Sequence, residues 1–376
     1  MKNKYVSTTS LLCFLLNFTL LQLILDLPML YSKVAYNAVW ILSIFLFSII
    51  LIYQFLITKM YIKFDGIDIF KISKFAIGKY FDKILYFLFF ISFFALTFIY
   101  LREIADTIKI IVFDDTRVLI ISSLYLIAMV LASYCGFNGI VRACGYIIPL
   151  CIVSIIFILF LVFPFMRIER LYPILGSGLE NITLNGIVRI NSYIGVGFLF
   201  LFVPFIKNIK YINKISYFYT ISSFILITFT VVVNTLIFEY PYTSSNLYAL
   251  YEMAKLTNYN LFFQRTEIIY ILALICITFL FLISMFFGAN YCLTQIFIKK
   301  DKKNKPSIIN IILGIILLIT ANLPNNIFEI FEIKPEVNIY LTIPIIFIIP
   351  FVILLIATIK SYINRSEYEK FISNSN

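Results

Sequence analysis

The side chains best placed to do chemistry in this sequence are polar residues that stand inside long apolar runs. Asp26 is the single acid of the run from residue 8 to 31, and it precedes Pro28 by two positions. A carboxylate inside a membrane is costly and therefore indicates a functional site. The alternative is that Asp26 lies at the outer membrane interface near Lys33, without such a role. The residue types leave both interpretations open.

A second polar group stands in the run from 186 to 206, where Gly195 and Gly197 are near the middle and Pro204 follows. Glycine weakens a helix and lets a ligand approach the backbone. Small residues also allow helices to pack closely in membranes. Both interpretations again stay open. The residues expected to line a ligand pocket are Gln22, Asp26, Tyr100, Ser192, Tyr193, Gly195, Gly197 and Asn290.

Such a lining suits a zwitterion, which carries one charge of each sign. Helix N-terminal N–H groups can face its carboxylate, while carbonyls and polar side chains face its ammonium. The charged residues Arg102, Glu103 and Asp106 stand toward the outer end of their run. They are expected to pair with one another.

Several kinds of chemistry have no residues to perform them. The chain has no histidine, and its six cysteines lie in or beside apolar runs without a CxxC pair. Nucleotide-loop, HExxH and GxSxG motifs are absent. We therefore expect no catalytic residues, no metal site and no cofactor.

The composition indicates a membrane protein. Hydrophobic residues make up 62% and charged residues 13%, and the mean hydropathy is +1.00. A soluble domain has nearer ~45–50% apolar and about 25% charged residues. The excess must be covered by lipid. The net charge of +11 is attributed to membrane orientation and not to nucleic-acid binding.

The apolar runs predict an all-α polytopic fold in a single transmembrane domain covering 1–376. Backbone groups in lipid must bond within their own segment, which favours helices. A cytoplasmic amphipathic helix is expected at 66–80, an outer loop at 167–185, and an outer amphipathic segment at 245–257 capped by Ser245. The ten predicted spans are 8–31, 36–58, 84–112, 118–135, 141–166, 186–206, 214–238, 267–298, 307–323 and 337–360.

The distribution of basic residues predicts the orientation. Twenty of the 30 bases fall at the two ends of the chain and in alternate loops, which are therefore cytoplasmic. Both termini are then inside, as an even number of spans requires. Five spans that start inside, followed by five that start outside, permit an inverted repeat of the amino-acid-permease (LeuT) type. The repeats would cover about 8–166 and 186–360.

Several motifs resemble those of one family. Residues 77–84 (IGKYFDKI) resemble a Gly-Lys signature before span 3, and residues 173–179 (PILGSGL) resemble an outer-loop P-x-L-G-x-G. Residues 263–269 (FQRTEII) resemble an F-x-R-I-E-x-I-F start of span 8, while Pro28 and Trp40 stand where that family has a proline ending span 1 and a tryptophan opening span 2. The chain thus resembles the B subunit of the nutrient germinant receptors of endospore-forming bacteria, within the amino acid–polyamine–cation transporter superfamily.

The resemblance implies a function as well as a fold. It implies sensing of a nutrient, usually an amino acid, in a pocket between broken spans 1 and 6. It also implies a complex with an A subunit and a lipoprotein C subunit in the inner spore membrane. Two departures bear on the ligand: Leu21-Gln22-Leu23 replaces the small residues usual in span 1, and span 6 has no acid.

Three other functions remain as alternatives. A secondary amino-acid transporter driven by Na⁺ or H⁺ would show ion-dependent uptake without partners. A membrane-embedded transferase would need an acid cluster, for which Asp65 and Asp68 are the nearest residues. A scaffold subunit would have a pocket that no longer binds.

Overall fold

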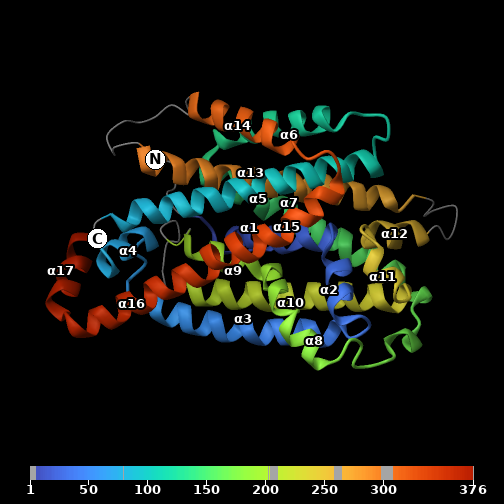
Figure 1. The fold of residues 1–376 in the computed structure, drawn as a ribbon, viewed down its shortest axis with the longest axis horizontal. Coiled ribbons are helices and arrows are strands. Elements are labelled where there is room, and N and C mark those ends of the chain that lie inside the picture. The colour runs from blue at the N-terminus through green and yellow to red at the C-terminus, as the bar shows by residue number, and fades with distance from the viewer. Residues whose placement is uncertain are drawn as a thin grey trace.

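Long apolar helices run side by side along the length of the molecule (Figure 1). The computed structural model describes residues 6–78, 80–201, 203, 211–257, 265–297 and 308–375. The predicted all-helical membrane architecture is confirmed, since the regular elements of this part of the chain are all helices. Six of its helices are long and apolar enough to cross a membrane: α3 (Val39–Ile62), α5 (Phe81–Ile111), α7 (Gly136–Leu161), α10 (Tyr211–Ile237), α13 (Glu267–Phe297) and the continuous helix Ile327–Ile363.

The remaining predicted spans are represented by a bent pair and by shorter apolar helices. The first predicted span is broken into two helices, α1 and α2, which meet at an angle of 64°. How many helices cross the membrane, and whether two halves repeat, stay predictions. The bounds are α1 Thr8–Ile24, α2 Leu27–Ala35, α6 Val118–Ser133, η3 Ile187–Tyr193 with α9 Ile194–Leu201, and α14 Ile308–Ala321.

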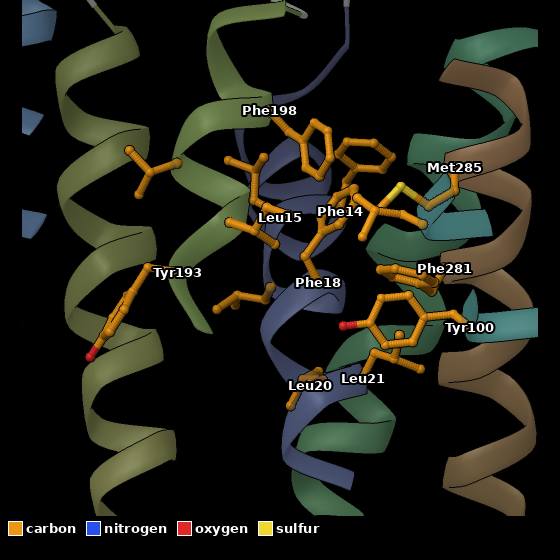
Figure 2. Packing of buried hydrophobic residues seen from close by; sticks show 14 of the residues in the cluster. Phe14, Leu15, Phe18, Leu20, Leu21, Tyr100, Tyr193, Phe198, Phe281 and Met285 are labelled. Atoms are coloured by element: carbon orange, nitrogen blue, oxygen red, sulfur yellow. The ribbon is translucent and has the colours of Figure 1, made fainter. Parts of the chain in front are cut away.

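The central helix is α1, which packs against α7, α10 and α13. Thirteen of its 17 residues are buried, and its aromatic side chains fill the space toward neighbouring helices (Figure 2). The ring of Phe18 lies 4.7 Å from that of Phe198 and 5.6 Å from that of Phe281, between centroids. The outer helices instead expose apolar residues, as lipid contact requires. The core therefore surrounds the broken span.

Pro28 explains why the first span breaks where it does. Proline has no N–H and disfavours helical backbone at the residue before it. Leu25 closes α1 with its N–H bonded to the carbonyl of Leu21, and α2 then starts with Pro28 in its first turn. Asp26 holds the N-cap position of α2, but its side chain makes no capping bond. The Asp26 carboxylate is thus left available for contacts with other helices.

The sixth predicted span changes helix type. Residues Ile187–Tyr193 form a 3₁₀-helix, which then continues as the α-helix α9. A 3₁₀ run of this length is uncommon and marks strain or a hinge. The change occurs before Gly195 and Gly197, which both lie inside α9. Pro204 lies outside the described residues.

The last predicted span begins ten residues earlier than expected. The helix runs from Ile327 to Ile363 through α15 (Ile327–Val337), two π-helical segments (η5 Asn338–Thr342 and η6 Pro344–Ile348) and α16 (Ile349–Ile363). Asn326 caps its start by accepting from the N–H of Glu329 at 3.1 Å. The early start places Lys334, which is 5% exposed, inside the helix bundle.

The predicted amphipathic helix at 66–80 is confirmed as α4 (Ile69–Ala76), which buries its apolar face and exposes lysines. α4 and the C-terminal helix α17 (Arg365–Ser375) gather at one end of the molecule (Figure 1). Phe75 of α4 stacks on Phe371 at 4.8 Å between ring centroids, and its carbonyl accepts from Lys360 at 2.9 Å. These contacts build a cap over the helix ends.

Asp68 is a partly buried acid in this cap. It caps α4 by accepting from the N–H of Phe70 at 3.2 Å, and burial raises its pKa from 3.8 to about 6. Because the folded state holds the proton more tightly, this group stabilises the fold most below pH 4, and the contribution is lost as the pH rises toward 6. Asp68→Asn keeps the cap without the charge. We expect its melting temperature in detergent to equal or exceed that of the wild type at pH 7.5, with a smaller difference at pH 4.5. A variant that melts earlier at pH 7.5 would disprove the assignment.

The opposite end of the molecule carries short helices that cover the break in the first span. α8 (Leu179–Leu184) lies beside α2, and α11 (Tyr242–Ser245) and α12 (Ala249–Leu256) follow α10. Two 3₁₀ turns, η1 (Phe163–Phe165) and η2 (Ile168–Leu171), lead into this region. The amphipathic segment predicted at 245–257 is found as α12, but the Ser245 cap is wrong. The residue at the N-cap position is Tyr248, and the Ser245 hydroxyl donates to the carbonyl of Tyr242.

Candidate ligand-binding site

A small cavity lies at the bend between α1 and α2. Residues from α1, α2, α5, η3, α15 and η5 line it, so it joins the first, third, sixth and tenth predicted spans. Its volume is about 20 Å³, which is room for about one water molecule. The lining residues are Gln22, Asp26, Leu27, Leu30, Tyr31, Tyr100, Val188, Arg189, Asn191, Ser192, Lys334, Pro335 and Asn338.

One wall of the cavity is a buried group of three charged side chains. The ammonium of Lys334 lies 2.7 Å from Asp26 Oδ2, and 3.0 and 2.8 Å from the two carboxylate oxygens of Glu103. Its nitrogen is also 4.7 Å from the ring centre of Tyr100. Lys334, Asp26 and Glu103 are each no more than 5% exposed. This ion triad ties α2, α5 and α15 together.

The geometry of the ion triad offsets the cost of burying it. Removing charges from water costs several kcal/mol per ion, and only close contacts and filled hydrogen bonds compensate. The three donor hydrogens of Lys334 face three carboxylate oxygens, and the Tyr100 ring adds a cation–π contact. With both carboxylates ionised, the triad has a formal charge of −1. A nearby positive group is therefore favourable.

The neighbouring charges form a separate pair. Arg102 Nε donates to Asp106 Oδ2 at 2.8 Å, and Arg102 Nη2 donates to the carbonyl of Asn325 at 3.2 Å. The expected pairing among Arg102, Glu103 and Asp106 is thus confirmed for two of them and wrong for Glu103. Residues three or four positions apart share a face of a helix, as Arg102 and Asp106 do. Glu103 directly follows Arg102, so it lies on a different face of α5, where it contacts Lys334.

Hydrogen bonds fix the cavity wall between α1 and η3. Gln22 Nε2 donates to the carbonyl of Asn191 at 2.9 Å, and the Tyr31 hydroxyl donates to Ser192 Oγ at 3.3 Å. Ser192 Oγ in turn donates to the carbonyl of Arg189 at 2.7 Å. Side chains of the broken first span therefore hold backbone and side chains of the 3₁₀ segment.

Four of the predicted ligand residues meet in this cavity: Gln22, Asp26, Tyr100 and Ser192. Tyr193 does not line it. In Figure 2, Tyr193 lies on the other side of α1 from Tyr100. Asn290 on α13 is also outside the lining. Ligand contact by each of these residues stays a prediction.

The two glycines of α9 serve close packing, which was one of the two interpretations of their presence. A Cβ at Gly195 would lie 2.7 Å from the Tyr219 ring and 3.0 Å from the carbonyl oxygen of Leu15. A Cβ at Gly197 would lie 2.1 Å from a methyl carbon of Ile346. Neither residue lines the cavity. The glycines let α9 approach α1, α10 and the tenth span.

Sequence reasoning missed Arg189, Lys334 and Asn338 as site residues. Arg189 follows a polar loop and starts a span, so it reads as an interfacial charge. Lys334 stands among Glu329, Glu332 and Glu336, which resemble a solvated loop. Pro335 next to Lys334 was a usable signal, since a proline within a helix marks a local irregularity. In the described part of the chain, no cluster of acidic or cysteine side chains is suited to hold a metal ion.

Comparison with known proteins places the chain in a family. A family model described as spore germination protein, a spore permease family, matches residues 5–330. No curated protein matches the chain. Lys334 and Asn338 lie beyond the matched residues, while Asp26, Glu103 and Arg189 lie within them. Because the match covers most of the chain, this integral membrane protein belongs to the spore germination protein family.

Proposed function

We propose that the chain is the B subunit of a nutrient-germinant receptor, and that it binds a small amino acid at the bend in its first span. The observation that carries the proposal is the cavity between the broken α1–α2 helix and η3. Broken helices at mid-membrane present free backbone groups, which is how permease-like folds bind substrates. The family assignment supplies the link to spore germination.

The cavity as described belongs to a closed state. Its 20 Å³ accepts a water molecule but not an amino acid. Ligand entry therefore requires helices to move apart, and the ion triad is the strongest connection among α2, α5 and α15. A ligand that binds the open state better shifts the population toward it. That shift would be the signal passed to the partner subunits.

The rest of the proposal follows from the family and the distribution of charges. We assign ten spans in a 5+5 inverted repeat within one transmembrane domain, with both termini cytoplasmic. The protein would reside in the inner spore membrane with an A subunit and a lipoprotein C subunit. It would act as a receptor and not as an enzyme.

The proposal is tested by filling the cavity. Val188 lines it, whereas Val153 on α7 is 64% exposed toward lipid. Spores carrying Val188→Trp are expected to lose their response to a panel of free amino acids, because the indole occupies the ligand volume. Spores carrying the matched Val153→Trp should germinate as the wild type does. Protein levels of the receptor subunits are measured in both by immunoblotting of inner membranes.

Unchanged germination of the Val188→Trp spores with every nutrient would overturn the proposal. Loss of response in both variants, at normal protein level, would also count against it, because the effect would not be specific to the cavity.

A further inference from the structure

Three residues that line the cavity each have a buried polar atom with no hydrogen-bond partner among the described residues. These atoms are Arg189 Nε, Asn191 Oδ1 and Asn338 Oδ1. Each is shielded from solvent, and Asn191 as a whole is only 6% exposed. Buried polar groups are almost always paired, so unpaired ones need an explanation. Three such residues share one cavity, where a ligand with complementary groups would give each of them a partner.

The chemistry of these atoms is complementary. Arg189 offers a positively charged donor, and the two amide oxygens offer acceptors. They come from two elements: Arg189 and Asn191 belong to η3, while Asn338 begins η5. A ligand between them would need a negatively charged acceptor at one end and N–H donors at the other.

The charges of the cavity lining indicate the net charge of the ligand. Lys334 is shared by Asp26 and Glu103, so the ion triad has a formal charge of −1 when both carboxylates are ionised. Arg189 supplies one positive charge, so the lining is neutral overall. A zwitterion preserves this balance in a medium of low dielectric, whereas a ligand with a net charge does not. The apolar part of the lining, Leu27, Leu30, Val188 and Pro335, suits a short aliphatic side chain.

We propose that Arg189 binds the carboxylate of a zwitterionic aliphatic amino acid, whose ammonium donates to the amide oxygens of Asn191 and Asn338. This inference rests on the proposed function and adds the residues that recognise each charged group. A guanidinium binds a carboxylate through its planar fork, which lysine cannot reproduce. Arg189 thereby determines that the ligand must be an acid.

The test compares each amino acid with its own amide, which lacks the carboxylate. Dose–response curves for spore germination are measured with glycine, L-alanine, L-valine and L-leucine, and with the corresponding amino-acid amides. Wild-type spores should respond to the best acid at a concentration roughly 10- to 100-fold below that of its amide, the range expected for one charged hydrogen-bonded contact.

In Arg189→Gln spores, the amino acid should be needed at a concentration roughly 10- to 100-fold higher, while the concentration needed of its amide changes little. The ratio of the two effective concentrations then approaches one. Arg189→Lys should give an intermediate ratio. Arg142→Gln, a substitution of an exposed arginine on α7, serves as the matched control and should keep the wild-type ratio. If the Arg189→Gln protein does not accumulate, the ratio of Arg189→Lys decides the question.

An acid-to-amide ratio that stays at the wild-type value in the Arg189 variant that accumulates would overturn this inference. If Val188→Trp abolishes the response while that ratio is unchanged, the cavity still binds the ligand and only the role of Arg189 is lost. If neither variant changes any response, the proposed function itself fails.

Discussion

Lys334→Met is expected to destabilise the protein by about 3–5 kcal/mol, the usual cost of removing one partner from a buried ion pair. The substitution leaves Asp26 and Glu103 buried in the helix bundle without the ammonium that contacts both of them. Both carboxylates are 2% exposed or less, so water cannot replace the lost ammonium. The effect should appear as low yield in membranes and as a lower melting temperature in detergent.

A neutral replacement of the whole triad provides the internal control. Lys334→Met combined with Asp26→Asn and Glu103→Gln removes all three charges and should recover most of the stability, because no charge is left unpaired. Lys255→Met is the matched control at the surface. Its partner Glu252 lies 3.7 Å away and both side chains are exposed, so the expected loss is about 0–1 kcal/mol. A Lys334→Met protein as stable as Lys255→Met would show that the triad is not formed.

Gly176→Ala is expected to release the outer loop from the broken span and to cost about 2–4 kcal/mol, combining backbone strain with a collision. Gly176 has φ +49°, and a Cβ there would lie 2.1 Å from the carbonyl oxygen of Ala35 and 2.9 Å from the nitrogen of Ala38. These are backbone atoms where α2 ends, and they cannot rotate away. The loop would have to move outward.

The loop that contains Gly176 is hydrogen-bonded to the end of α2. Ser177 Oγ and Asn181 Nδ2 both donate to the carbonyl of Val34, at 2.6 and 2.9 Å. Asn37 Nδ2 donates to the carbonyl of Tyr172 at 2.7 Å. We expect limited proteolysis between 167 and 185 to be faster in Gly176→Ala membranes than in the wild type.

A substitution at Gly178 distinguishes the steric collision of an added Cβ from the backbone strain of a positive φ. It also has a positive φ, of +91°, but a Cβ there meets no atom within 4 Å. Gly178→Ala should therefore lower stability through strain alone and leave the loop docked, with cleavage as slow as in the wild type. Equal cleavage of the two variants would contradict the proposed role of Gly176.

The sequence was sufficient to predict the helices, because each apolar run must satisfy its own backbone in lipid. It also indicated the break in the first span, since Pro28 disrupts a helix through local chemistry alone. The start of the last span was missed. The segment contains charged residues at 329, 332, 334 and 336, a pattern that is typical of a solvated loop. Lys334 is buried because it pairs with Asp26 and Glu103, which are distant in the sequence.

The site was predictable only in part for the same reason. Gln22, Asp26, Tyr100 and Ser192 stood out as polar residues in apolar runs, and the structure brings them to one cavity. The pairing of Lys334 with Glu103 joins residues 231 positions apart, and nothing in the local pattern of either reveals the other. Gly195 and Gly197 left two interpretations open, because close packing and ligand approach require the same residue type.

The central claim is that a small amino acid binds in the cavity at the bend of the first span. The most direct measurement is the melting temperature of the purified protein in detergent, recorded with increasing concentrations of free amino acids. A ligand that binds only the folded state stabilises it by RT ln(1 + [L]/Kd), so the melting temperature rises with ligand concentration. At least one amino acid should raise the melting temperature of the wild type and of Val153→Trp, but not that of Val188→Trp. An equal rise in Val188→Trp, or no rise with any amino acid, would contradict the account.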